Sequence, residues 1–258
     1  MHGSVKHPYL PIYGNKVLAL RMGYLDMHGV KRDRTWTVLE STAEANSTTI
    51  TLRDPVDWQV GEEIAIAPTT FESRDAEQKK IVAIDRTNPN KPVITLDSKL
   101  TTKRFAETQT FGDKEIDMRA EVGLLSRNVV FQGDSSSFDD QYGATVFLHS
   151  MGDDSLTARL ENVEFTNVGQ AFKVGRYAVH FHMIGNVHNS YIKSNAVHTS
   201  FNRAFTMHGT SYLRIINNVV YDVMGHNIFI EDAVERHNQI HDNLVIMTKR
   251  SWSLLNTD

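Results

Sequence analysis

The segment that decides the fold reads IINNVVY at residues 215–221, and its pattern returns four more times in the second half of the chain. In every copy an asparagine precedes an apolar residue, and an apolar or aromatic residue stands two positions after that one. The other copies are LSRNVVF (125–131), RLENVEF (159–165), IKSNAVH (192–198) and IHDNLVI (240–246). The asparagines are separated by 34, 33, 23 and 25 residues; they are Asn128, Asn162, Asn195, Asn218 and Asn243.

This recurrence predicts a parallel β-helix that begins at about residue 120. A coil of 23 to 25 residues suits one rung, and the longer intervals suit rungs that carry an inserted loop. A single rung cannot bury its apolar face, so stacked rungs share one core. Asparagine at a rung corner tolerates a left-handed backbone, and its amide can bond to the asparagine of the next rung. We therefore predict a structural asparagine ladder without a catalytic role.

The first half of the chain also predicts strands. Pro55 and Gly61-Glu62 divide residues 50–66 into three short strands. Seven large apolar residues of this run fall on even positions, with Ala65 between the last two, which places the seven on one face of extended backbone; they are Ile50, Leu52, Val56, Trp58, Val60, Ile64 and Ile66. The segments KIVAID (80–85) and PVITLD (92–97) continue the pattern. No capped helical periodicity is present, so the predicted fold class is all-β.

Composition excludes several classes of protein. The net charge is −4 with acids and bases mixed, whereas a nucleic-acid-binding protein usually has a basic surplus. No apolar run is long enough to span a membrane, and residues 1–20 lack the pattern of a signal peptide. The chain has no cysteine, so disulfides and thiolate metal sites are absent. The triplet Asn46-Ser47-Thr48 makes Asn46 a candidate glycosylation site.

Motifs between residues 23 and 69 stand in a recognisable order. GYLDMHG (23–29), RTWT (34–37) and VDWQVGEEIAIA (56–67) resemble the G-eight domain, a β-rich domain of the fibrocystin-L-like and cell-migration-inducing hyaluronan-binding family. The resemblance implies a partial G-eight domain over residues 1–119. It implies a right-handed parallel β-helix of the pectin-lyase type over residues 120–258.

The second half extends this resemblance. AEVGLLSRNVVFQGD (120–134), GRYAVHFHMIGNV (175–187) and SWSLLNTD (251–258) resemble the β-helix region of the family, and the last is closer to its fibrocystin-L-like branch. The resemblance implies that the chain is part of a longer extracellular or cell-surface protein, secreted or tethered to the membrane. The β-helix is expected to be truncated at its C-terminal end.

The candidate site is a column of ionisable residues in successive coils. His180 and His182 are two apart in a predicted strand, so both point to the same face. His208 takes the place of His182 in the next coil, and Glu231 and Asp232 follow one coil later, on opposite faces of their strand. Because neighbouring rungs lie about 4.8 Å apart, aligned side chains can share a metal ion or a proton.

Three interpretations of this column stay open. In the first, Glu231 or Asp232 is the general acid or base of a carbohydrate-cleaving site, and His182 and His208 position sugar hydroxyls. In the second, His180, His182 and His208 bind a divalent metal, calcium or zinc, with a carboxylate as the further ligand. In the third, the column is a structural stack whose members hydrogen-bond only to one another.

Arg176, His180 and Arg203 are candidates for binding an acidic polysaccharide such as hyaluronan, although isolated basic residues are usually solvated charges. From the resemblance we expect an extracellular carbohydrate- or matrix-recognition module of a large fibrocystin-L-like surface protein. The alternatives are a hyaluronan-depolymerising glycosidase and a structural β-helix spacer. We expect neither a nucleic-acid partner nor membrane insertion by this segment.

Overall fold

The computed structural model describes residues 1–250, so the SWSLLNTD motif at 251–258 lies outside the described residues. The chain forms two compact units. The larger comprises Met1–Lys31 and Arg127–Asp258, and the smaller comprises Arg32–Ser126. Among the described residues, no helix is both long and apolar enough to cross a membrane.

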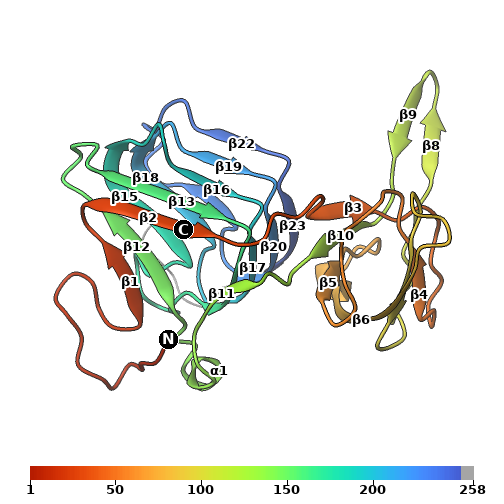
Figure 1. Ribbon diagram of the computed structural model, residues 1–258, viewed down its shortest axis with the longest axis horizontal. Helices are drawn as coiled ribbons and strands as arrows, with labels where there is room; N and C mark the ends of the chain where they lie inside the picture. The colour runs from red at the N-terminus through yellow and green to blue at the C-terminus, as the bar shows by residue number, and fades with distance from the viewer. Residues whose placement is uncertain (251–258) are drawn as a thin grey trace. The chain divides into compact units, whose positions relative to one another are not determined.

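The larger unit is a parallel β-helix with three sheets of five strands each (Figure 1). The first sheet contains β1 (Val17–Leu20), β12 (Thr145–His149), β15 (Val179–Asn186), β18 (Phe205–Ser211) and β21 (Ile228–Ile230). The second contains β2 (Gly23–His28), β13 (Leu156–Glu161), β16 (Tyr191–Lys193), β19 (Arg214–Ile216) and β22 (Gln239–His241). The third contains β11 (Val129–Gln132), β14 (Val163–Val168), β17 (Ala196–Ser200), β20 (Val219–Met224) and β23 (Leu244–Lys249). Each rung contributes one strand to each sheet, which confirms the predicted parallel β-helix.

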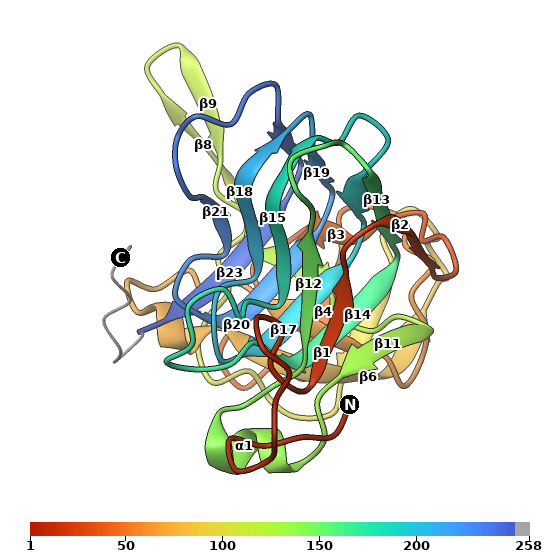
Figure 2. The same ribbon diagram turned by 90° about the vertical axis from the view of Figure 1, so that its left-hand side faces the viewer.

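Alternation within the strands explains how the rungs share a core. In β13, Leu156, Ala158 and Leu160 are buried, while the residues between them are partly exposed. Equivalent apolar residues of the neighbouring rungs stack on these three and form one continuous cluster. Figure 2 shows the strands of the first sheet side by side, which places their outward side chains in columns.

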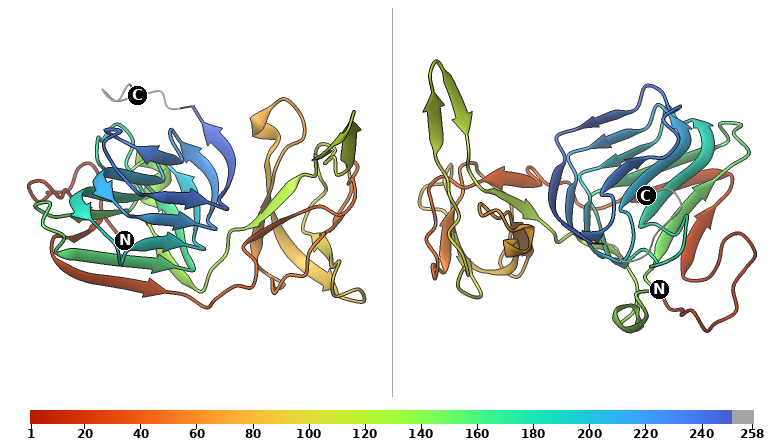
Figure 3. Two further views of the ribbon diagram at one scale, coloured as in Figure 1. Left: turned by 90° about the horizontal axis from the view of Figure 1, so that it is seen from above. Right: turned by 180° about the vertical axis from the view of Figure 1, so that it is seen from behind.

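The smaller unit is an antiparallel sheet with a separate hairpin (Figure 3). The strand order is β3 (Trp36–Val38), β10 (Glu121–Leu124), β5 (Glu63–Ile66), β6 (Glu77–Asp85), β7 (Val93–Leu96) and β4 (Thr49–Thr51). The hairpin consists of β8 (Thr108–Phe111) and β9 (Lys114–Asp117), and Ser73–Asp75 forms a short helix, η1. Trp58 is fully buried, as expected, and its indole nitrogen donates to Arg34 O at 2.8 Å. Val60 departs from the predicted alternation, because residues 53–62 form no strand and its side chain is 61% exposed.

The units do not follow the expected linear division at residues 119 and 120. Residues 1–31 belong to the β-helix, where β1 pairs with β12 and β2 with β13, both in parallel. The smaller unit is therefore an insertion in sequence between β2 and β11, within the first rung. The sequence of residues 16–29 shows only the alternation of apolar and polar residues that is common to β-strands in general. Because their partners lie more than a hundred residues later, that local pattern cannot reveal which sheet they join.

The predicted ladder is present in three rungs. The side-chain oxygen of Asn218 accepts the backbone N–H of Asn195 at 2.9 Å, and that of Asn243 accepts the N–H of Asn218 at 3.0 Å. The Asn195 oxygen accepts the N–H of Val163 at 2.9 Å, and the Asn218 amide donates to Ile192 O at 3.0 Å. These bonds satisfy buried backbone groups at the corner between the second and third sheets.

The other asparagines depart from the predicted ladder. Asn162 stands one register position earlier, where its own backbone is left-handed with φ of 53°. In the later rungs the left-handed residue is the one before the ladder asparagine, as at Ser194. Asn128 instead accepts the N–H of Val30 at 2.7 Å. The left-handed turn and the amide ladder are thus provided by different residues of the corner.

Replacing Asn218 by alanine should lower the free energy of unfolding by about 3 kcal/mol, because buried groups of two rungs lose their partners. Asn189→Ala is the matched control, since its side chain is exposed in the same unit, and it should cost less than about 0.5 kcal/mol. Urea unfolding measures both values. Equal losses in the two variants would contradict the structural role of the ladder.

Candidate functional site

Four histidines form a strip on the outer face of the first sheet. His149 on β12, His182 on β15 and His208 on β18 pair in parallel register, so their side chains form one column. Glu231 directly follows β21, and because Met207 of β18 pairs with Ile230, it stands in register with His208. His180 lies two residues before His182 on the same face. We call His149, His180, His182 and His208 the histidine strip.

The ring of His180 is held in one orientation by a hydrogen bond at one nitrogen, while its other nitrogen has no hydrogen-bond partner among the described residues. Its ring is 2% exposed, and Nδ1 lies 3.0 Å from the carbonyl oxygen of Gly175. A carbonyl only accepts, so Nδ1 carries the proton and Nε2 has a free lone pair in the neutral ring. Burial lowers the pKa of His180 well below its usual value, which keeps the ring neutral. Within residues 1–250, Nε2 has no hydrogen-bond partner.

Three of these histidines converge. The ring centroids lie 4.9 Å apart for His180 and His182, and 4.7 Å apart for His182 and His208. One nitrogen from each of His180, His182 and His208 lies within 4.8 Å of the other two. The predicted convergence of these residues is thus present in the structure, and their nitrogen atoms face a common space.

Both carboxylates reach His208. Asp232 Oδ2 lies 2.8 Å from His208 Nε2, while Glu231 Oε2 lies 3.6 Å from His208 Nδ1 and 3.9 Å from His180 Nε2. The expectation that Glu231 and Asp232 point to opposite faces of a strand is wrong, because β21 ends at Ile230 and the chain turns there. Glu231 Oε2 is buried and has no hydrogen-bond partner among the described residues.

Glu235 holds the turn that carries these carboxylates. Its Oε1 accepts the backbone N–H of Gly209 at 2.9 Å and that of Asp232 at 3.3 Å. Its Oε2 accepts the N–H of Val234 at 3.0 Å. The side chain therefore ties the turn after β21 to β18, the strand that carries His208.

The protonation of the site follows from burial. Burial, with a smaller effect of His208, lowers the pKa of His182 to about 4. Burial raises the pKa of Glu231, and the charges of His208 and Arg203 partly oppose this. Neutral imidazoles with free lone pairs can coordinate a metal ion or accept from sugar hydroxyls. A carboxyl group with a raised pKa can act as a proton donor.

The two candidate arginines lie in different environments. Arg176 is partly exposed, and its guanidinium lies 5.2 Å from the centroid of Phe147. Arg203 is only 1% exposed, donates to the hydroxyl of Tyr177 at 2.9 Å and stacks on Phe229 at 4.0 Å. This burial does not fit the expectation that Arg203 contacts a polysaccharide. Arg203 is instead positioned to support the packing of the rungs beneath the site.

Two further residues of the site, His149 and Phe147, were not predicted from the sequence. The ring of Phe147 lies 5.3 Å from that of His180, and the ring of His149 lies 5.3 Å from that of His182. A signal for His149 was present: it precedes His182 by 33 residues, the interval that separates Asn162 from Asn195.

The predicted glycosylation site has the exposure that a glycan requires. Asn46 is exposed at a turn before β4, and its backbone N–H donates to Leu100 O at 2.8 Å. Its glycosylation stays a prediction.

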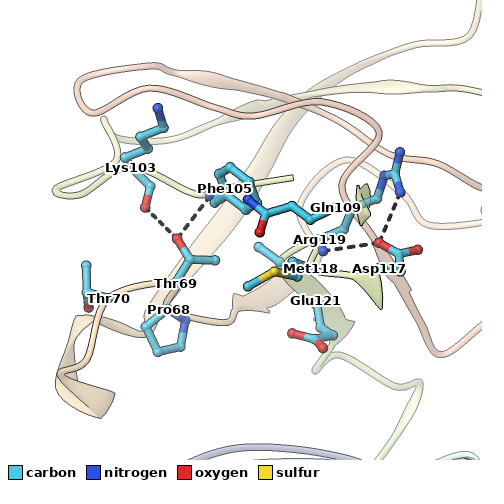
Figure 4. Close-up of a pocket in the computed structure, with 11 residues that line it drawn as sticks. Pro68, Thr69, Thr70, Lys103, Phe105, Gln109, Asp117, Met118, Arg119 and Glu121 are labelled. Atoms are coloured by element: carbon cyan, nitrogen blue, oxygen red, sulfur yellow. Dashed lines mark hydrogen bonds and ion pairs between the residues drawn. The ribbon is translucent and has the colours of Figure 1, made fainter. Parts of the chain in front are cut away.

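The smaller unit contains a hollow of about 650 Å³ between residues 68–70 and 103–121 (Figure 4). Several of its polar groups are already paired. Thr69 Oγ1 donates to Lys103 O at 3.1 Å and accepts the N–H of Phe105 at 3.0 Å, while Arg119 bonds to Asp117 at 3.0 Å. Arg119 Nε is the one buried atom of this lining without a hydrogen-bond partner among the described residues, whereas several such atoms lie close together in the histidine strip. We therefore take the histidine strip as the candidate site.

Glu235→Ala should release the turn after β21, because the N–H groups of Gly209 and Asp232 lose their acceptor. We expect amide hydrogen exchange of Gly209 to become at least about tenfold faster, with a loss of about 1 kcal/mol in stability. Glu235→Gln retains an oxygen acceptor and should keep most of the protection. Unchanged exchange of Gly209 in the alanine variant would show that Glu235 does not hold the turn.

The lowered pKa of His182 predicts a pH dependence of stability in metal-free buffer. Between the unfolded value of 6.5 and about 4, the unfolded chain binds a proton that the folded chain does not, so stability falls as pH decreases. After allowance for solvent screening, His182 should contribute about 1–2 kcal/mol to this fall. His182→Gln should flatten the curve by that amount in urea unfolding at pH 7 and pH 4. Parallel curves would contradict it.

Comparisons with known proteins agree with the motifs. Residues 141–258 match the family model described as CEMIP beta-helix. The whole chain is 35% identical to part of fibrocystin-L from Mus musculus and from Homo sapiens, and it spans 7% of each. Over 90% of its length it is 33% identical to a G8 domain-containing protein of Dictyostelium discoideum, of which it spans 15%. The chain therefore corresponds to a small part of these relatives. These matches confirm the predicted resemblance, and the chain belongs to the fibrocystin-L-like family that shares the CEMIP β-helix.

Proposed function

We propose that this chain is a carbohydrate- or matrix-recognition module of a large extracellular or cell-surface protein, with the histidine strip as its binding site. Two observations support the proposal: the geometry of the site and the family of the chain. The branch of this family that gives the CEMIP β-helix its name, the cell-migration-inducing hyaluronan-binding proteins, is associated with hyaluronan. Membership alone does not assign the ligand, because the chain spans only 7% of fibrocystin-L.

One observation carries the proposal: buried polar atoms converge without partners. Nε2 of His180, Nδ1 of His182 and Oε2 of Glu231 are all buried and form no hydrogen bond with the described residues. Leaving such a group unpaired costs about 1–3 kcal/mol each. His182 and His208 are partly exposed, so a ligand with several hydroxyl groups, such as a polysaccharide, would reach these two rings and provide hydrogen-bond donors beside the buried cluster.

The same atoms argue against a simple spacer. In a purely structural stack the buried nitrogens and carboxylates would all have partners, as His198 and Glu164 do at 3.0 Å on the third sheet. Here Asp232 pairs with His208 at 2.8 Å, but the buried atoms of His180, His182 and Glu231 named above stay unpaired among the described residues. His180 lies 3.9 Å from Glu231, too far for a hydrogen bond. A rigid spacer has no need for this arrangement.

A divalent metal is a second candidate ligand of the same cluster. Three imidazole nitrogens with a nearby carboxylate oxygen resemble the donor set of zinc, whereas calcium prefers oxygen ligands. His180, His182 and His208 would provide the nitrogens and Glu231 the oxygen. A stoichiometric heat of zinc binding that is lost in His182→Gln would favour this ligand.

Hyaluronan depolymerisation is the competing function. It is favoured by the raised pKa of Glu231 beside His208, because a general acid needs a carboxyl group that holds its proton near neutral pH. Asp232, which pairs with His208, would orient the imidazole. The enzyme would shorten the polymer, whereas a recognition module would leave its length unchanged.

Binding of hyaluronan oligosaccharides to the 258-residue chain tests the proposal by calorimetry. His182→Gln and His208→Gln should each weaken binding about tenfold, since each removes a ring nitrogen from the site. His241→Gln is the matched control, because His241 is exposed on β22 of another sheet, and its affinity should not change.

Absence of binding to hyaluronan and to a panel of other matrix glycans would contradict the recognition function. The chain length of high-molecular-weight hyaluronan is followed in the same samples, with and without calcium. Shortening that disappears in Asp232→Asn would identify the competing enzyme instead.

A further inference from the structure

The two ends of the histidine strip carry opposite charges. Glu231 and Asp232 lie at the end formed by the last rung. At the other end, Arg21 follows β1 of the first rung, and Arg176, which precedes β15 of the third rung, lies over Phe147 of β12. The face of the first sheet therefore has a direction, from guanidinium groups to carboxylates.

Arg21 extends the column by one rung beyond His149. Leu20 pairs with Leu148, so Arg21 takes the position next to His149 where β1 ends. Two effects lower the pKa of His149: first the burial of its ring, and second the positive charge of Arg21. Arg21 therefore lies close to the His149 ring. The side chain is exposed, and it forms no ion pair with any residue in the described range 1–250.

Arg176 precedes β15 and also lacks an anionic partner within the part of the chain that the structure describes. Its guanidinium stacks on Phe147 at 5.2 Å and donates to the carbonyl oxygen of Ile12. Burial lowers the pKa of Arg176, because its guanidinium is partly removed from water and no carboxylate lies close enough to offset this. The ring of Phe147 in turn stacks on that of His149, with centroids 5.9 Å apart.

We infer that Arg21, Arg176 and His149 form an anion subsite for a carboxylate of an acidic polysaccharide, whose chain runs along the β-helix axis toward Glu231. This inference rests on the proposed recognition function and names the ligand class and its orientation. Arginine suits the role because its planar guanidinium binds carboxylates through paired hydrogen bonds.

The charges of the strip fix the direction of such a chain. Arg21 and Glu231 are separated by four rung steps, about 19 Å, which leaves room for several sugar rings. A ligand carboxylate is attracted by Arg21 and Arg176 and repelled by Asp232. The uncharged hydroxyl groups of the intervening sugars face the partly exposed imidazoles of His149, His182 and His208, which can accept hydrogen bonds.

The test uses two probes of equal length, a hyaluronan oligosaccharide and the same oligosaccharide after reduction of its carboxyl groups to neutral alcohols. In the 258-residue chain, Arg21→Ala and Arg176→Ala should each weaken hyaluronan binding about tenfold. Each should change the affinity for the neutral probe less than twofold. The salt dependence of hyaluronan binding should also become shallower in both variants.

Arg159→Ala is the matched control, since Arg159 lies on the second sheet and already faces Asp26 at 3.8 Å; it should leave both affinities unchanged. Arg21→Lys and Arg176→Lys should keep part of the affinity because they keep the charge. Equal weakening for both probes, or no weakening for hyaluronan, would overturn the anion subsite. Failure of the unaltered chain to bind either probe would instead contradict the proposed function itself.

Discussion

Parallel register between successive rungs is the constraint on which the rest of this structure depends. Each strand of the β-helix pairs with the equivalent strand of the next rung, so a residue type that recurs in the sequence recurs in space at steps of about 4.8 Å. This register stacks the apolar residues into one core and aligns Asn195, Asn218 and Asn243 as a ladder. It also places His149, His182 and His208 in one column.

Much of the fold could be predicted because the β-helix is a local repeat. The recurrent asparagines and the two-residue alternation are both visible in short windows. They correspond to observed elements except at Asn128 and Asn162, which depart from the ladder, and at residues 53–62, which form no strand. The place of residues 1–31 could not be predicted in the same way. Their strands are ordinary in sequence, and only long-range pairing with β12 and β13 assigns them to the β-helix. The predicted boundary at residues 119 and 120 assumed that the two domains follow one another along the chain, whereas the smaller unit is inserted within the first rung.

The candidate site could be predicted in part for a related reason. His180, His182 and His208 lie on the regular part of the repeat, so sequence spacing brought them together correctly. Glu231 and Asp232 lie after the end of β21, where the two-residue alternation of a strand no longer applies, and both reach His208. The burial of Arg203 between Tyr177 and Phe229 depends on packing of neighbouring rungs, which a charge in a sequence does not reveal.

The central claim is that the histidine strip is a ligand site with free imidazole nitrogens. Nitrogen-15 NMR of the histidine side chains tests it most directly, first without ligand and then with a hyaluronan oligosaccharide. The account predicts a neutral His180 with its proton on Nδ1, and resonances of His182 and His208 that shift on addition of the oligosaccharide. The exposed His188 and His241 should not shift. Unchanged His182 and His208 resonances at saturating oligosaccharide, or a proton on Nε2 of His180, would contradict the account.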